Sequence, residues 1–148
     1  MAVLVREQAF PRRREELFAF FADPSNLEAI TPPWLNFRIV TPMPVQMGAG
    51  TLLDYRLRLF KVPFGWRTRI EAWDPPRRFR GVQIEAPYAT WYSRHEFEER
   101  DGGTLMRDTV RYAVPCGPLG AAARVLLVRR WLDRIFDFRR DVLADRYR

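Results

Sequence analysis

The C-terminal end of the chain carries its clearest pattern of hydrophobic and polar positions. At about 100° per residue, apolar side chains fall on one broad face of a helix, and arginine and aspartate side chains fall on the opposite face. A cluster rich in proline and glycine at 115–120 marks the start of this segment and cannot continue a strand. The pattern predicts a long amphipathic helix over 118–148, whose apolar face is interrupted by Arg139. The apolar positions are Val128, Trp131, Leu132, Ile135, Phe138, Val142 and Leu143.

The rest of the chain reads as one strand, two short helices and a series of strands. Residues 3–10 predict the first strand, and 14–22 predict a helix whose first turn is acidic, which suits the helix dipole. Asp23 and Pro24 are typical of the cap and first position of a second short helix ending near Ile30. The strands that follow are separated by turn signals and spaced as in an antiparallel meander, which predicts an α+β fold. They cover 36–41, 51–60, 64–74, 78–84, 88–99 and 104–114.

The last hairpin can be placed in register from its turn and its charges. A two-residue turn at Asp101-Gly102 puts Glu96 opposite Arg107, an attractive cross-strand pair. Moving the turn by one residue would put Arg94 against Arg111, so the first register is preferred. It also pairs His95 with Asp108, Phe97 with Met106, Ser93 with Val110 and Trp91 with Tyr112.

Two further turns give registers for the middle strands. A turn at Pro75-Pro76 sets Thr68 opposite Gln83 and Ala72 opposite Phe79. A turn at Lys61-Val62 sets Tyr55 opposite Thr68 and Leu57 opposite Trp66. Because side chains alternate between faces, one face of the sheet is predicted to be mostly charged and the other mostly apolar, and the C-terminal helix covers the apolar face.

The apolar face of the predicted sheet also contains polar side chains. A solid core rarely tolerates several of them, because each buried polar group needs a partner. Apolar walls with a few convergent polar groups are typical of a ligand cavity. The polar residues are Gln83, Ser93, His95 and Asp108, with the hydroxyls of Tyr55, Thr68 and Tyr112.

Length and composition restrict the class of protein. The 148 residues fit a single domain over 1–148, and the only cysteine, Cys116, excludes an internal disulfide and fits a reducing cytoplasm. No apolar run is long enough for stable membrane insertion. The net charge of +7 is spread among interleaved acids and bases, so we expect no nucleic-acid partner. We also expect no metal, because the single histidine and the cysteine lie far apart in sequence, and no cofactor.

Several stretches resemble the START/polyketide-cyclase/pollen-allergen superfamily (SRPBCC), most closely its bacterial ligand-binding and cyclase/dehydrase-like members. The resemblance covers nearly the whole chain. It implies a helix-grip fold: a curved antiparallel sheet of about seven strands, with two short helices after the first strand, wrapped on a long C-terminal helix and enclosing a cavity. The stretches that carry it are 26–37, 50–57, 66–70, 87–97, 108–112, 128–131 and 135–139.

Ligand binding is the function that this resemblance favours. It implies a non-enzymatic protein that holds a hydrophobic or amphipathic small molecule, lipid-, sterol- or polyketide-like, between sheet and helix. The alternative is a polyketide cyclase/dehydrase-type enzyme. Related bacterial chains often have a second histidine at the position of Ser93, so a relay between two histidines is not expected here. The expected ligand-binding residues are Tyr55, Trp66, Thr68, Gln83, Trp91, Ser93, Tyr112 and Arg139.

Two of the candidate groups have open alternatives. His95 and Asp108 form the one acid/base pair that the predicted register provides, and they either catalyse or form a buried hydrogen bond that shapes the cavity. Arg139 either binds an anionic head group of the ligand or pairs with Asp108. The aliphatic run 125–128 is expected at the base of the cavity, or it supports a homodimer or a membrane-surface contact.

Overall fold

The protein, seen in a computed structural model that describes residues 2–59, 62–85, 90–113 and 121–147, has the predicted order of elements. A strand is followed by short helices, six strands and a long helix, which confirms the α+β class. The elements are β1 (Ala2–Phe10), α1 (Arg14–Ala22), the 3-10 helices η1 (Pro24–Leu27) and η2 (Pro33–Leu35), β2 (Arg38–Ile39), β3 (Leu52–Leu59), β4 (Val62–Asp74), β5 (Arg78–Glu85), β6 (Thr90–Arg100), β7 (Gly103–Ala113) and α2 (Ala121–Arg146).

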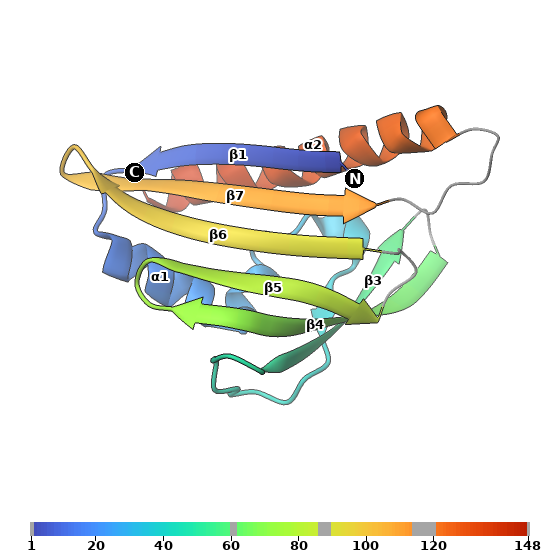
Figure 1. Cartoon of the computed structure of the whole chain (residues 1–148), viewed down its shortest axis with the longest axis horizontal. Coiled ribbons are helices and arrows are strands. Elements are labelled where there is room, and N and C mark those ends of the chain that lie inside the picture. Colours follow the sequence, from blue (N-terminus) through green and yellow to red (C-terminus); the bar gives the residue numbers. More distant parts are fainter. Residues whose placement is uncertain (1, 60–61, 86–89, 114–120, 148) are drawn as a thin grey trace.

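All seven strands form one antiparallel sheet in the order β1-β7-β6-β5-β4-β3-β2. The chain therefore runs as a meander from β2 to β7, and β1 returns to the β7 edge. Both α1 and α2 lie on the same side of the sheet, with α2 running along β1 and β7 (Figure 1). This is the arrangement that the helix-grip resemblance implies.

The β6–β7 hairpin forms in the predicted register. Glu96 pairs with Arg107 and His95 pairs with Asp108. Asp101 and Gly102 both have positive φ, at 52° and 78°, as a tight hairpin turn between right-twisted strands requires. Along β7, buried and half-buried residues alternate, so this strand has one face toward the helices.

The predicted registers of the middle strands are partly wrong. Tyr55 pairs with Trp66 rather than Thr68, and Leu57 pairs with Phe64. A turn at Lys61-Val62 would leave Val62 unpaired, but Val62 pairs with Leu59. The pairing of β3 with β4 is therefore shifted by two residues from the predicted register. A shift of two residues leaves each side chain on its predicted face.

One register error does change a face. Thr68 pairs with Gln83 as predicted, but an irregularity in the pairing lies between Ile70 and Ala72. Beyond it, Ala72 pairs with Arg80 instead of Phe79, and Trp73 pairs with Phe79. The extra residue turns Ala72 to the outer face and Trp73 to the inner one, as a bulge does.

Two short elements are smaller than predicted. The Asp23 side chain accepts a hydrogen bond from the Ser25 backbone N–H at 3.0 Å, which confirms the predicted cap. The helix that it begins is a single 3-10 segment ending at Leu27. The strand predicted over 36–41 is reduced to Arg38–Ile39.

The inner face of the sheet packs against the helices through three groups of buried side chains. Leu132 and Phe136 of α2 contact residues of β1 and β7, while Ile135 contacts the η2 and β3 region. Leu143 joins an aromatic cluster around α1. The predicted apolar face of α2 therefore covers the sheet.

Two residues of α2, Leu126 and Leu127, do not follow the prediction for 125–128, whereas Val128 is half-buried and packs against the Leu132 cluster. Leu126 and Leu127 are 64% and 52% exposed, so they do not lie at the base of a cavity. Nothing in the described chain covers them. None of the helices in the described part combines the length and apolar character that a bilayer-spanning segment requires.

Candidate functional site

A pocket of about 200 Å³ lies between the inner face of the sheet and α2. Its wall is mostly aromatic and aliphatic, with polar atoms from a few residues on different elements. Strands β3 to β7 form one side and α2 forms another, and α1, the segment around η1 and η2 and Met47 contribute the rest. Its main apolar residues are Leu35, Phe37, Leu57, Trp66, Phe79, Trp91, Trp131 and Ile135, and its polar residues include Tyr55, Thr68, Ser93, His95 and Arg139.

The pocket exists because three neighbouring strands carry small residues at the same level of the sheet. Gly81 of β5 pairs with Ser93 of β6, and Thr68 of β4 lies on its other side. A Cβ atom added at Gly81 would be 3.0 Å from Cγ2 of Thr68 and 3.5 Å from Oγ of Ser93. Larger side chains at these three positions would fill the space under α2, so their size maintains the pocket.

His95 and Asp108 come together as predicted. The Nδ1 atom of His95 lies 2.6 Å from Oδ1 of Asp108, and the two side chains are 13% and 4% exposed. The imidazole stacks on Phe79 with ring centres 4.6 Å apart, and Phe21 lies nearly parallel to it at 6.4 Å. His95 lines the pocket, whereas Asp108 does not. Asp108 thus fixes the ring orientation from behind and leaves Nε2 for the pocket.

Arg139 enters the pocket from α2. Its side chain is half-buried, but its Nε atom is fully buried and makes no hydrogen bond to any residue that the structure describes. The guanidinium lies 5.1 Å from the centre of the Phe136 ring. Burial lowers the pKa of the Arg139 guanidinium below its usual value, and the charges of Asp108 and Tyr55 act in the opposite direction. The group is therefore a desolvated cation next to the pocket.

Tyr55 faces Arg139 from the sheet side of the pocket. Burial raises the pKa of its hydroxyl above the usual value, and the neighbouring Thr68 side chain lowers it by less. The phenol is therefore neutral near pH 7 and can donate a proton in a hydrogen bond. Its ring packs against Phe37 with centres 5.0 Å apart.

Seven of the ten residues predicted for the site line this pocket, and three do not. Asp108 lies directly behind His95. Tyr112 is 2% exposed and packs with Leu132 in the core beside the pocket. Gln83 is half-buried, and both of its amide atoms are buried without a partner among the described residues. The residues in the wall are Tyr55, Trp66, Thr68, Trp91, Ser93, His95 and Arg139.

Sequence reasoning missed the residues that give the pocket its shape. Gly81 is the main one, although a glycine inside a predicted strand is itself a signal of a close approach or an open space. The loop residues Leu35 and Phe37 also line the wall, and no periodic pattern identifies them. Trp131 and Ile135 were predicted on the helix face but not assigned to the site.

Residue types that ligate metals are scattered in the described ranges. No three side chains of histidine, cysteine, aspartate or glutamate gather there closely enough to hold an ion. The single cysteine, Cys116, lies outside the described residues.

Comparison with known proteins identifies the family. The sequence model of the family described as polyketide cyclase/dehydrase and lipid transport matches residues 1–148. Protein TTHA0849 from Thermus thermophilus has a similar structure, with a TM-score of 0.72 and 18% identity over 97% of this chain and 99% of that one. Protein Ms6760 from Mycobacterium smegmatis has a TM-score of 0.69 and 18% identity over 95% of this chain and 87% of that one. A search of curated proteins finds no match.

Ara h 8.0201 also has a similar structure, with a TM-score of 0.63 and 16% identity over 97% of this chain and 98% of that one. At such identities the solved structures support the fold alone. The family match is independent of them and spans the whole chain, so the resemblance to the SRPBCC superfamily is confirmed. The chain belongs to the polyketide cyclase/dehydrase and lipid transport family.

Proposed function

We propose that this protein binds a small hydrophobic or amphipathic molecule in the pocket between the sheet and α2. The observation that carries the proposal is the pocket itself, with aromatic walls and a few polar groups that converge from separate elements. This is the composition of sites that bind small molecules. The family description includes lipid transport, which is consistent with a binding function.

The pocket volume restricts the size of the proposed ligand. At about 200 Å³ the pocket is smaller than typical ligand sites of about 300–1000 Å³. Of the lipid-, sterol- and polyketide-like molecules that the fold suggests, we therefore favour the smallest, a compact system of one or two rings. Trp66 and Trp91 lie edge to face, with ring centres 5.1 Å apart and planes at 86°, so a flat ligand would stack on one ring and contact the edge of the other.

Binding can be tested with 2-naphthol, a neutral compound of two rings. Trp66, Trp91 and Trp131 line the pocket, so occupancy should quench the intrinsic tryptophan fluorescence. Replacing Ser93→Leu places a large side chain in the pocket and should weaken binding at least tenfold. Tyr92→Leu is the matched control, because Tyr92 is the next residue on β6 and is 39% exposed. If 2-naphthol does not bind, or if both variants bind it like the wild type, the proposed function is wrong.

A second candidate function, catalysis, is favoured by one specific observation. His95 lines the pocket with Nε2 available and Nδ1 held by the Asp108 carboxylate at 2.6 Å. This arrangement suits a general base that removes a proton from carbon next to a carbonyl group, as a cyclisation or dehydration requires. Asp108 would then stabilise the imidazolium that forms.

Proton exchange tests the catalytic role. In D₂O the wild type should accelerate deuterium incorporation next to the carbonyl of α-tetralone, a compact ketone of two rings, as measured by NMR. His95→Ala should abolish the acceleration and leave 2-naphthol binding largely intact. An exchange rate equal to that of buffer alone, or one that His95→Ala does not change, would leave His95 as a structural residue.

A further inference from the structure

We propose that the ligand carries a single carboxylate and that Arg139 binds it, with an aromatic or aliphatic body in the rest of the pocket. This inference rests on the proposed binding function and names the class of ligand. It depends on the charge balance of the pocket wall, on the partners of the arginines of α2, and on the kind of polar groups around Arg139.

The pocket wall carries one formal charge in the described chain, and it is positive. No aspartate or glutamate is among the residues that line the pocket, and Arg139 is the one arginine there. The nearest buried carboxylate, Asp108, already lies at hydrogen-bond distance from His95. Within the described residues, no ion pair of 4.0 Å or less joins Arg139 to Asp108 or to another carboxylate. A cationic ligand would meet an unfavourable charge here, and an anionic one would meet a counter-charge.

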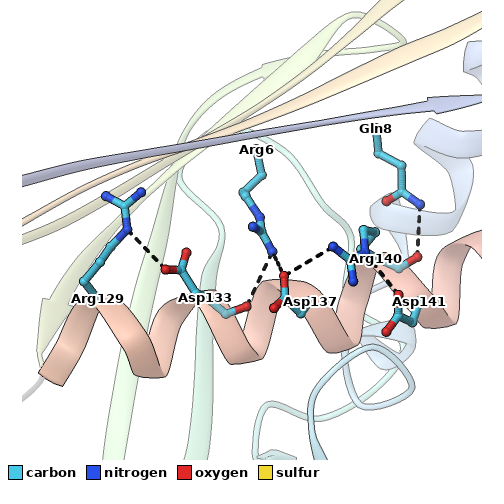
Figure 2. Close-up of polar contacts among 7 residues, drawn as sticks. All are labelled: Arg6, Gln8, Arg129, Asp133, Asp137, Arg140 and Asp141. Carbon is cyan, nitrogen blue, oxygen red and sulfur yellow. Dashed lines mark hydrogen bonds and ion pairs between the residues drawn. The ribbon is translucent and has the colours of Figure 1, made fainter. Parts of the chain in front are cut away.

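The other arginines along α2 show that the helix does not lack carboxylates. On the side facing β1, Arg129 pairs with Asp133, and Arg140 pairs with Asp137 and Asp141 (Figure 2). These are half-exposed pairs at the surface. Arg139 comes directly before Arg140 in sequence, but it points to the other side and has no such partner in the described chain. Within the described chain, Asp133, Asp137 and Asp141 thus pair with surface arginines, and none of these three acids pairs with the half-buried Arg139.

The geometry of Arg139 suits a carboxylate. Its Nε is fully buried and donates to no described group, and a guanidinium has donors but no acceptor. Leaving such a group unpaired in a dry site costs free energy, which a bound anion would recover. The contact with the Phe136 ring at 5.1 Å limits where the guanidinium can move, so less freedom is lost when the ligand binds.

The remaining polar groups of the pocket can all donate hydrogen bonds. Hydroxyl groups of Tyr55, Thr68 and Ser93 reach the wall from β3, β4 and β6. The phenol of Tyr55 can donate at neutral pH, because its ordinary pKa is already 10.0 and burial raises it further. A site rich in donors with one positive charge matches an acceptor with one negative charge. A dianionic phosphate would keep a net buried charge, so we favour a carboxylate.

A structural role for Arg139 is the competing explanation. A second, smaller pocket of about 30 Å³ lies between β1, β7 and α2 and is lined by Asp108 and Arg139 together. Its volume is about that of one water molecule, and a water there could bridge the two side chains. In that case Arg139 would serve the fold, and the charge of a ligand would not matter.

The test compares an acid with its neutral amide. Cinnamate and cinnamamide have nearly the same shape, and one ring with a short chain suits a pocket of about 200 Å³. We expect the wild type to bind cinnamate at least tenfold more tightly than cinnamamide by calorimetry at neutral pH. Arg139→Gln should remove the difference by weakening cinnamate alone. Arg140→Gln lowers the net charge equally at an exposed neighbouring position and should retain the preference.

Each result decides between the explanations. If the wild type binds cinnamate and cinnamamide equally, or if Arg139→Gln keeps the preference, the carboxylate site is wrong while ligand binding stands. If neither compound binds but 2-naphthol does, the carboxylate site is again wrong. If 2-naphthol also fails to bind, the proposed function fails with it. Thermal unfolding of Arg139→Gln shows whether the variant is folded, and Arg139→Lys, which keeps the charge, should restore part of the preference.

Discussion

The two ends of the inner face of the sheet are built differently. At the end covered by α1, aromatic side chains form a buried cluster in which most pairs pack edge to face; Phe18, for example, lies 5.1 Å from Trp73 and 5.4 Å from Phe97 between ring centres. Under the middle of α2, the same strands instead surround a pocket of about 200 Å³. Along β6, the inward residue changes from Phe97 to His95 and then to Ser93. The side chains become smaller and more polar toward the pocket.

This difference separates what stabilises the chain from what it can bind. The end covered by α1, which we call the closed end, buries large rings and supplies apolar contacts on which folding depends. The end around the pocket, which we call the hollow end, leaves a space bordered by the half-buried Arg139 and by His95, which is held by Asp108. Phe79 lies at the boundary, because it packs on Phe18 in the closed end and stacks on His95 in the pocket.

The largest expected effect comes from removing a ring at the closed end. Phe18→Ala should lower the free energy of unfolding by about 3–5 kcal/mol, because the ring is 4% exposed and its contacts cannot reform around the cavity. Urea denaturation followed by circular dichroism measures the change. Phe37→Ala is the matched variant at the hollow end and should cost about 1 kcal/mol, because that ring is half-buried and already borders an open space. Equal losses would show that the two ends do not differ in packing.

Most of the closed end could be predicted from the sequence. The periodicity of α2 and the hairpin turn at Asp101-Gly102 are local patterns with one good solution, and both predictions are confirmed. The error at Ala72 has a physical cause, since a bulge adds one residue to a strand without any strong local signal. Each register that depended on a less distinctive turn was less accurate.

The hollow end could be predicted only in part. Polar residues on an apolar face identified His95, Ser93 and Arg139, because such residues contradict the pattern around them. The shape of the pocket depends on Gly81, and a glycine inside a strand can mark a close approach, a bulge or an open space, so the sequence alone does not say which applies. Whether a residue lines the pocket also depends on its position along the strand. Tyr112 lies in the core beside the pocket, because residues of α2 pack directly on it.

A smaller effect should appear at high pH, and it concerns the hollow end. Burial raises the pKa of Tyr55 in the folded state, whereas in the unfolded chain the phenol ionises near its ordinary value of 10.0. Above that pH the unfolded state binds fewer protons than the folded state, so stability is fully present below pH 10 and falls as pH rises beyond it. At pH 11 this one group should lower the free energy of unfolding by about 1 kcal/mol.

Tyr55→Phe isolates this contribution. Its stability, measured by urea denaturation between pH 9 and 11, should fall less steeply than that of the wild type. Tyr92→Phe is the control, because Tyr92 is exposed on the outer face and its replacement should leave the slope unchanged. If both variants give the wild-type slope, Tyr55 ionises as easily in the pocket as in the unfolded chain, and the hollow end is wetter than its apolar wall indicates.

The smallest effect on the free energy of unfolding is expected where β1 meets α2. It tests whether ion pairs, rather than aromatic packing, hold α2 on the sheet. Arg6 of β1 pairs with Asp137 and donates to the Asp133 carbonyl, and Gln8 donates to the Arg140 carbonyl at 3.0 Å (Figure 2). The Arg6 and Asp137 side chains are 30% and 46% exposed, so water and salt screen their attraction.

A double-mutant cycle with Arg6→Met and Asp137→Asn should give a coupling free energy of about 0.5 kcal/mol in urea denaturation, and this coupling should fall further in about 1 M salt. Because both side chains are partly exposed, each single variant should leave its former partner in contact with water rather than buried. A coupling as large as the Phe18→Ala loss would mean that polar contacts along this edge, and not the aromatic packing, hold α2 on the sheet.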